Sequence, residues 1–186
     1  MKSNKIEIEY GDVFHSNKSA IVIPRSTTGT ISNHFENGLK EIHHNHNLES
    51  LPYRSLGSLD IVQFNNASNK IEPALHILYA TCVDNNTSTY DAIEEIARGI
   101  ARFSSNNPNI RNIATPLIGT GEGRLNHYQV YKILFETFDK LANNSCRLYI
   151  FIKDEAIYYN LLNEIEKNET NKLSDTNNWR YNFYSR

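Results

Sequence analysis

Three glycines stand within five positions in the segment 119–123, written G-T-G-E-G, although the whole chain of 186 residues contains only eight glycines. Glycine weakens helices and strands, so such a cluster needs a reason in the backbone. One reason is a loop whose N–H groups approach an anion such as a phosphate, with the hydroxyl of Thr120 and the guanidinium of Arg124 beside them. The other is a tight turn. Spacing alone leaves both open, because the segment is neither a Walker A motif nor a G-x-G-x-x-G fingerprint.

The patterns on either side place this glycine segment at the edge of a sheet. The apolar run 110–117 before it predicts a buried strand, and the apolar periodicity of 126–142 predicts a helix with Asn126 as its N-cap. A second loop of small polar residues, 24–30, likewise follows an apolar strand and precedes a helical pattern. Ligands of open α/β sheets bind beyond the carboxyl ends of the strands. Two such loops at one edge could therefore hold a diphosphate between them.

Strand and helix patterns alternate along the chain in the order β-β-α-β-β-α-β-α-β-α. This order predicts an α/β domain of three layers (α/β/α) with a mixed sheet that is parallel in its centre. We expect the ligand-binding domain to cover residues 1–168 and a polar tail with several aromatic residues to follow at 169–186. Strands are expected at 5–10, 19–24, 57–64, 74–83, 110–117 and 146–153, and helices at 31–42, 89–105, 126–142 and 154–167. Thr89 is the N-cap candidate of the helix at 89–105.

Composition and charge argue against several classes of function. The net charge of −2 and the pI near 6.4 give no general attraction to nucleic acid or to a membrane surface. No run approaches 18 apolar residues and the first residues contain no apolar signal segment, so we expect a cytoplasmic protein, attached to a membrane only through a further segment of a longer parent. Cys82 and Cys146 lie in apolar strand patterns and are expected to be buried, reduced thiols.

The remaining polar candidates have simpler interpretations. The histidines His43, His44 and His46 lack the spacing that would put two imidazoles on one face of a helix, so no metal is assigned, and no cofactor either. Asp12 follows the first predicted strand in a turn, which its side chain would ordinarily cap. Glu122 is the one carboxylate of the glycine segment, and it could act as a base on water or orient a hydroxyl or amine.

Together, Asp12, the two loops and the order of strands resemble the macro domain family, which binds ADP-ribose. The segments "GDVFHSNKSAIVIP" (11–24) and "ATPLIGTGEGRL" (114–125) carry the resemblance, which covers about residues 6 to 165. It implies that Asp12 and Val13 face the adenine and that the loops 26–31 and 117–124 clasp the diphosphate and distal ribose. The resulting set of predicted ligand-binding residues is Asp12, Val13, Arg25, Ser26, Thr27, Thr28, Gly29, Thr30, Ile31, Leu117, Gly119, Thr120, Gly121, Glu122, Gly123 and Arg124.

The sequence departs from the hydrolytic branches of this family at their catalytic positions. One branch carries Asn-Ala-Ala-Asn and a glycine run where this chain has "IPRSTTGT", and another carries a lysine and an aspartate where this chain has "ATCVDNN" (80–86) and "EG". The resemblance therefore implies a binding module rather than an enzyme. The alternatives are an ADP-ribosyl hydrolase with a divergent catalytic set, in which Glu122 is the candidate base, and an interaction domain with a decayed pocket.

Within the family, the chain resembles the macro-domain sensors of bacterial Thoeris-type anti-phage systems. In those systems a TIR-domain enzyme converts NAD into an ADP-ribose derivative, linked to histidine in one type, which the macro domain detects. The resemblance implies the same kind of ligand here and a TIR enzyme as the partner that supplies it. Glu122, Arg25 and the segment 84–90 would then contact the group on the distal ribose.

Overall fold

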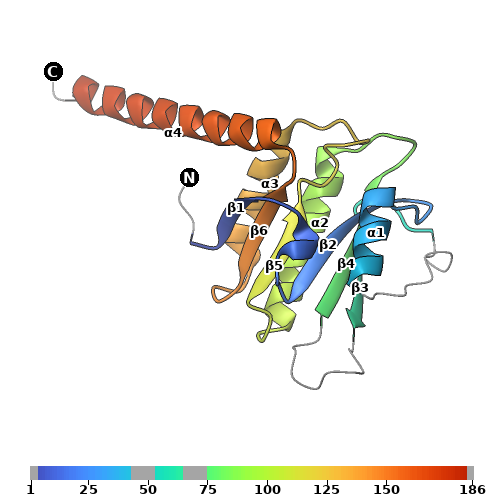
Figure 1. Cartoon of the computed structure of the whole chain (residues 1–186). Coiled ribbons are helices and arrows are strands. Elements are labelled where there is room, and N and C mark those ends of the chain that lie inside the picture. The colour runs from blue at the N-terminus through green and yellow to red at the C-terminus, as the bar shows by residue number, and fades with distance from the viewer. Residues whose placement is uncertain (1–3, 43–52, 65–74, 184–186) are drawn as a thin grey trace.

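The computed structural model describes residues 4–42, 53–64 and 75–183. These residues form a six-stranded sheet with helices on both of its faces (Figure 1). The strands are β1 (Ile6–Tyr10), β2 (Ala20–Ser26), β3 (Leu59–Phe64), β4 (Leu75–Val83), β5 (Asn112–Pro116) and β6 (Arg147–Ile152). The helices are the short 3-10 helix η1 (Val13–His15) and the α-helices α1 (Asn33–Glu41), α2 (Tyr90–Asn106), α3 (His127–Leu141) and α4 (Glu155–Phe183).

The strands lie in the order β1-β6-β5-β2-β4-β3. All neighbouring strands pair in parallel except β3, which pairs antiparallel with β4 at one edge. The predicted mixed sheet with a parallel centre is therefore confirmed. Because β2, β4 and β5 run in the same direction, the loops that follow them leave the sheet from one edge.

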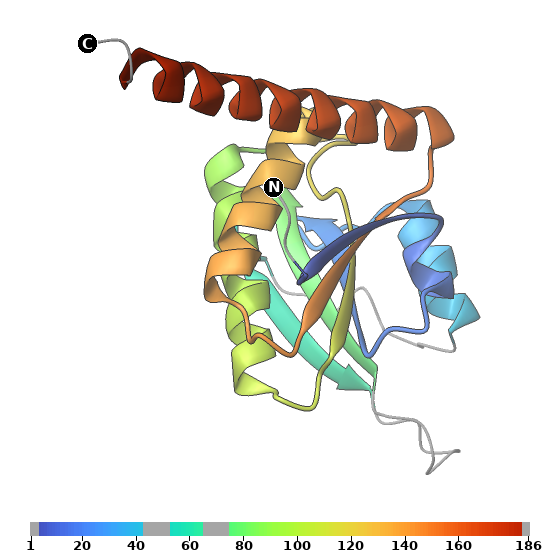
Figure 2. The ribbon, with the colours of Figure 1, turned by 90° about the vertical axis from the view of Figure 1, so that its left-hand side faces the viewer.

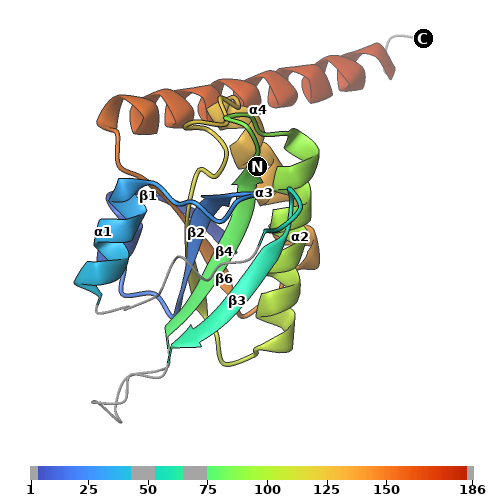
Figure 3. The same cartoon turned by 90° about the vertical axis from the view of Figure 1, so that its right-hand side faces the viewer.

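The sheet is the middle of three layers, as the order of elements predicts. Figure 2 shows α2 and α3 on one face and α1 on the other, and Figure 3 shows the opposite view. Alternate residues of β2 serve the two faces: Val22 packs in the cluster with α2 and α3, whereas Ile21 and Ile23 pack in the cluster with η1 and α1. This period of two is what a strand buried on both faces requires.

Side-chain caps fix the starts of the two long helices beside the sheet. Thr89 Oγ1 accepts a hydrogen bond from Ala92 N at 3.2 Å at the start of α2. Asn126 Oδ1 accepts one from Gln129 N at 3.0 Å at the start of α3. Both N-caps were expected from the sequence and are confirmed. Each satisfies an N–H group that the first helical turn leaves without a partner, and so fixes where the preceding loop ends.

The last helix is longer than the periodicity predicts. The apolar pattern ends near residue 167, because Ile157, Leu161 and Ile165 pack against the domain and no such series follows. The helix nevertheless continues to Phe183 through a stretch that contains neither glycine nor proline, and its C-terminal part lies beyond the other elements (Figure 1). The division between domain and tail at residue 168 stays a prediction. No helix in the described part of the chain combines the length and apolar character that crossing a bilayer requires.

Gly38 tests the packing of α1 against η1. A Cβ atom at this position would lie 2.2 Å from the ring of Phe14. Gly38→Ala should lower the free energy of unfolding by about 1–3 kcal/mol through overpacking, although alanine favours a helix by about 1 kcal/mol over glycine. Urea unfolding measures the change. Asn37→Ala, at the exposed neighbouring position, is the control and should be neutral or stabilising. Equal stability of Gly38→Ala and the wild-type protein would contradict this packing.

Candidate functional site

A cavity of about 270 Å³ opens at the carboxyl ends of β2, β4 and β5. Its floor is largely apolar, with Pro24, Val83 and Pro116 at the strand ends, and hydroxyl groups and a carboxylate lie around it. Apolar walls with a few convergent polar groups are typical of sites for small ligands. The lining residues are Pro24, Arg25, Ser26, Thr30, Ser32, Phe35, Cys82, Val83, Pro116, Leu117, Ile118, Gly119, Gly121 and Glu122.

The first loop (26–31) brings hydroxyl groups to the cavity. Its backbone is closed by hydrogen bonds from Ser26 N to Thr30 O (2.8 Å) and from Gly29 N to Ser26 O (3.0 Å). The turn needs a positive φ of 89° at Gly29. Ser26 Oγ, Thr28 Oγ1 and Thr30 Oγ1 follow one another at 2.8 and 3.2 Å, and Ser26 and Thr30 line the cavity. The first loop therefore offers hydroxyls, which can donate or accept.

The second loop (117–124) brings backbone donors to the opposite side. Hydrogen bonds from Leu125 N to Gly119 O (3.1 Å) and from Arg124 N to Gly121 O (3.0 Å) fold it into a compact turn. Among the hydrogen bonds of the described residues, none is donated by the N–H groups of Gly121, Glu122 or Gly123. Successive backbone N–H groups without acceptors can bind an anion.

Glycine stands at the three positions of the second loop for different structural reasons. A Cβ at Gly123 would lie 2.5 Å from Gly119 O, and Gly119 itself has a φ of +77°. The tight turn thus explains these two glycines. A Cβ at Gly121 would meet nothing within 4 Å, although this residue lines the cavity. The turn therefore does not explain Gly121. The tight-turn interpretation is confirmed at Gly119 and Gly123, and the anion-binding interpretation stays a prediction at Gly121.

The segment between β4 and α2 supports both loops. Thr27 N donates to Val83 O at 2.9 Å and Thr27 Oγ1 donates to Asp84 Oδ1 at 2.7 Å, which anchors the first loop. On the other side, Ser88 packs so closely against the second loop that a Cβ at Gly123 would lie 2.6 Å from Ser88 Cβ. The segment 84–88 therefore holds the two loops in register with each other.

Cys82 is among the lining residues but is fully buried, whereas Glu122, also a lining residue, is exposed. Burial raises the pKa of Cys82 to about 11, although the nearby backbone N–H of Gly119 acts in the opposite direction. The negative charge of Glu122 adds to the increase in this pKa. The thiol therefore stays neutral near pH 7 and is a poor nucleophile.

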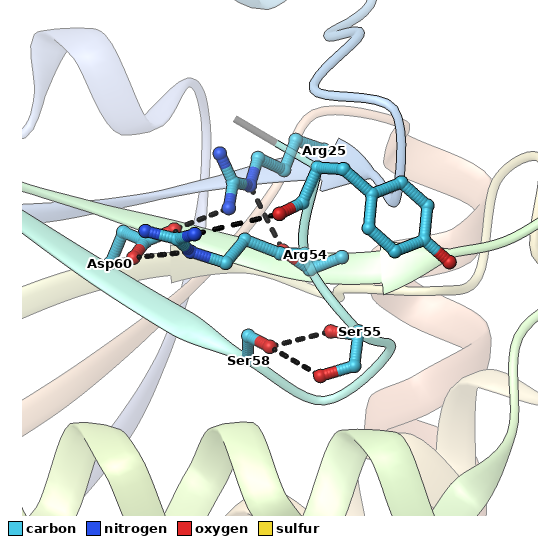
Figure 4. Close-up of polar contacts among 7 residues, drawn as sticks. Arg25, Arg54, Ser55, Ser58 and Asp60 are labelled. Atoms are coloured by element: carbon cyan, nitrogen blue, oxygen red, sulfur yellow. Dashed lines mark hydrogen bonds and ion pairs between the residues drawn. The ribbon is translucent and has the colours of Figure 1, made fainter. Parts of the chain in front are cut away.

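Arg25 lies on the cavity wall, but its guanidinium is bound elsewhere. Its Nε donates to Thr81 Oγ1 at 2.9 Å, and its Nη2 pairs with Asp60. Arg54 Nε donates to the same Asp60 carboxylate at 3.0 Å, so one carboxylate lies between two guanidinium groups (Figure 4). Burial lowers the pKa of Arg25, and the charge of Asp60 opposes this shift. Arg25 therefore joins β2 to β3 through its Nε and Nη2, while its buried Nη1 has no hydrogen-bond partner among the described residues.

Asp12 lies outside the wall of this cavity. Its Oδ1 accepts from Phe14 N at 3.1 Å, which is the turn cap expected from the sequence. Its Oδ2 lies 3.3 Å from His34 Nε2 and 3.4 Å from Lys153 Nζ. His34 is followed directly by Phe35, which lines the cavity. The first turn of α1 therefore contacts Asp12 through His34 and lines the cavity through Phe35.

The predicted ligand-binding residues fall into two groups. Those on the cavity wall are Arg25, Ser26, Thr30, Leu117, Gly119, Gly121 and Glu122. Those off the wall are Asp12, Val13, Thr27, Thr28, Gly29, Ile31, Thr120, Gly123 and Arg124. Two further wall residues, Pro24 and Ile118, lie within the predicted loops 24–30 and 117–124 without having been singled out. Wall residues that the sequence did not indicate are Ser32, Phe35, Cys82, Val83 and Pro116. His43, His44 and His46 lie outside the described residues, within which no cluster of three potential metal ligands occurs.

Comparison with known proteins identifies the fold. No protein-family model matches the sequence, and a search of curated proteins gives no match. Among solved structures, the macrodomain of Mycobacterium tuberculosis DarG is 18% identical with a TM-score of 0.63, covering 82% of this chain and 100% of that one. A Trypanosoma brucei macrodomain in complex with ADP-ribose is 15% identical with a TM-score of 0.66, and the match covers 87% of this chain and 69% of that one. An Oceanobacillus iheyensis macrodomain mutant with ADPR is 17% identical with a TM-score of 0.63, and the match covers 90% of this chain and 97% of that one. The chain therefore has the macrodomain fold.

Proposed function

We propose that this chain is a non-catalytic module that binds ADP-ribose, or a nucleotide derived from it, as a signal in bacterial anti-phage defence. The observation that carries the proposal is the pair of loops at the carboxyl edge of the sheet. Gly121 and Glu122 of the second loop line the cavity, and their N–H groups have no acceptor among the described residues, while Ser26 and Thr30 of the first loop line the same cavity with hydroxyls. Solved macrodomains with ADP-ribose bound support the same class of ligand.

A diphosphate fits the chemistry of these loops. The N–H groups of Gly121 and Glu122 would donate to phosphate oxygens, and Ser26 and Thr30 would complete the hydrogen bonds from the other side. The cavity of about 270 Å³ is at the small end for a ligand site and suits part of a dinucleotide-sized ligand. The base would then extend past Phe35 toward Asp12.

The charge of Glu122 favours a ligand in which a further group is attached to the distal ribose of ADP-ribose. A carboxylate next to a bound diphosphate is repelled by it, and Arg25, the one basic side chain among the described residues of the wall, is already paired with Asp60. A hydrogen-bond donor or a cation attached to the distal ribose would relieve this repulsion. Histidine-ADP-ribose, made from NAD by a TIR-domain enzyme, carries such groups.

The hydrolase alternative would depend on Glu122 alone among the ionised groups of the described wall. The Cys82 thiol is neutral near pH 7, and the guanidinium of Arg25 is held by Asp60 and Thr81. We therefore favour binding without turnover, in a protein that acts in the cytoplasm. A membrane would be involved only through a further segment of a longer parent.

Calorimetric titration with ADP-ribose, histidine-ADP-ribose and NAD tests the proposal, with mass spectrometry of each mixture afterwards. We expect one ligand to bind and to remain intact. Asp12→Ala should weaken binding by about tenfold to a hundredfold, because a hydrogen bond to a charged acceptor is lost. Asn109→Ala, at an exposed position before β5 and away from the cavity, is the control. Turnover would establish a hydrolase, and the absence of binding to all three compounds would refute the proposal.

Substitutions at Gly121 and Gly123 of the second loop distinguish an effect on ligand binding from an effect on folding. Gly121→Glu should abolish binding by placing bulk and negative charge in the cavity, yet change stability by only about 0.5 kcal/mol, since its Cβ meets nothing. Gly123→Ala should lower the free energy of unfolding by about 1–3 kcal/mol, because its Cβ would collide with Gly119 O and Ser88. Urea unfolding and titration of both variants measure these effects. Retained affinity in a folded Gly121→Glu protein would contradict the placement of the diphosphate.

Glu122→Gln tests the preference for a substituted distal ribose. The variant keeps the size of the side chain and removes its charge. Affinity for histidine-ADP-ribose should fall by about threefold to tenfold, as expected for loss of a partly exposed charge pair. Affinity for unsubstituted ADP-ribose should stay equal or rise, because the repulsion of the diphosphate is removed. An equal loss for both ligands would mean that Glu122 serves the loop rather than the substituent.

A further inference from the structure

The turn that contains Asp12 is joined directly to the beginning of α4. Gly11 N donates to Ile152 O at 3.0 Å, and the rings of Tyr10 and Tyr158 lie 5.7 Å apart. The third connection is the ion pair between Asp12 Oδ2 and Lys153 Nζ at 3.4 Å. These contacts attach the last helix to the position where the proposed function places the base of the ligand.

Lys153 connects the turn that contains Asp12 to the start of α4. It directly precedes Asp154, whose Oδ1 accepts from Ile157 N at 2.9 Å and whose carbonyl oxygen accepts from Tyr158 N at 3.0 Å. Asp154 therefore caps the first turn of α4. A single peptide unit separates Lys153 from this cap.

The Asp12 carboxylate has little capacity left for a ligand. Oδ1 is taken by Phe14 N, and Oδ2 faces both His34 and Lys153, while Lys153 Nζ also lies 3.4 Å from His34 Nδ1. The side chain of Asp12 is 14% exposed, whereas that of Lys153 is 67% exposed. A base amine that approaches Oδ2 competes with Lys153, the partner that water can most readily solvate once it is released.

We propose that Lys153 competes with the ligand's base for Asp12 and, when displaced, passes the change to α4. This inference rests on the proposed function, because it takes Asp12 as the position of the base. Binding of an adenine amine would break the ion pair and release the residue next to the helix cap. Since α4 has 29 residues and its C-terminal part lies beyond the other elements (Figures 1 and 3), a small change at its first turn moves its far end much further. Its length of roughly 44 Å follows from a rise of about 1.5 Å per residue.

Hydrogen–deuterium exchange of the first turn of α4 in the full chain tests this link. In the unliganded protein, Lys153→Met should raise exchange there by about twofold to fivefold, the range of a partly exposed ion pair. Lys153→Arg should restore the wild-type rate, and Lys132→Met on α3 is the matched control. ADP-ribose should raise exchange in the wild-type protein and have no further effect on Lys153→Met, whose affinity should be about twofold to fivefold higher.

A double-mutant cycle keeps the test independent of the ligand. The single variant Asp12→Asn and the double variant with Lys153→Met should both show the same hydrogen exchange as Lys153→Met alone. The reason is that both substitutions break the same ion pair between Asp12 and Lys153. Additive effects in the cycle, or bound ADP-ribose that leaves α4 unchanged, would overturn the link and leave the proposed function standing. Coupling in the cycle without binding of ADP-ribose, histidine-ADP-ribose or NAD would refute the proposed function and the competition at Asp12, while Lys153 would still be the tether of α4.

Discussion

Parallel pairing at the centre of the sheet is the constraint on which the site depends. β2 pairs in parallel with both β4 and β5, so these three strands end at one edge and the segments that follow them meet there. No local preference of the loops could bring residues 26 and 121 to one cavity. The apolar runs that make these strands buried on both faces are therefore also the reason that a site exists.

The loops at this edge combine a fixed frame with unused hydrogen-bonding groups. The first loop satisfies most of its own backbone through Ser26, Gly29 and Thr30, and the segment after β4 anchors it through Thr27. The second loop closes on itself through Gly119 and Gly121 and still leaves three consecutive N–H groups without acceptors among the described residues. Backbone groups near the surface are usually solvated when unpaired, so a ligand replaces water here at little cost in rearrangement.

Most of the fold could be predicted from the sequence because the signals are local. Apolar periodicity identified the strands and helices, and Thr89 and Asn126 marked the beginnings of two helices. The extension of α4 was missed because its C-terminal part has no apolar series to reveal it. In the site, the glycine and hydroxyl loops were identifiable, whereas Phe35 and Cys82 were not, since apolar residues in ordinary periodic patterns carry no mark of lining a cavity. The partners of Arg25 and Asp12 were missed for another reason: Asp60 and Lys153 are distant in sequence and meet them only in the folded chain.

The pairing of Arg25 with Asp60 also restricts how this sequence can change over evolutionary time. The guanidinium is buried on β2 and its carboxylate partner comes from the edge strand β3. Losing Asp60 alone would leave the buried charge of Arg25 without compensation, which destabilises a fold strongly, whereas losing Arg25 would leave Asp60 still paired with Arg54. Related chains that carry the arginine should therefore also carry the carboxylate, so the two positions should covary in an alignment although they lie far apart in the sequence.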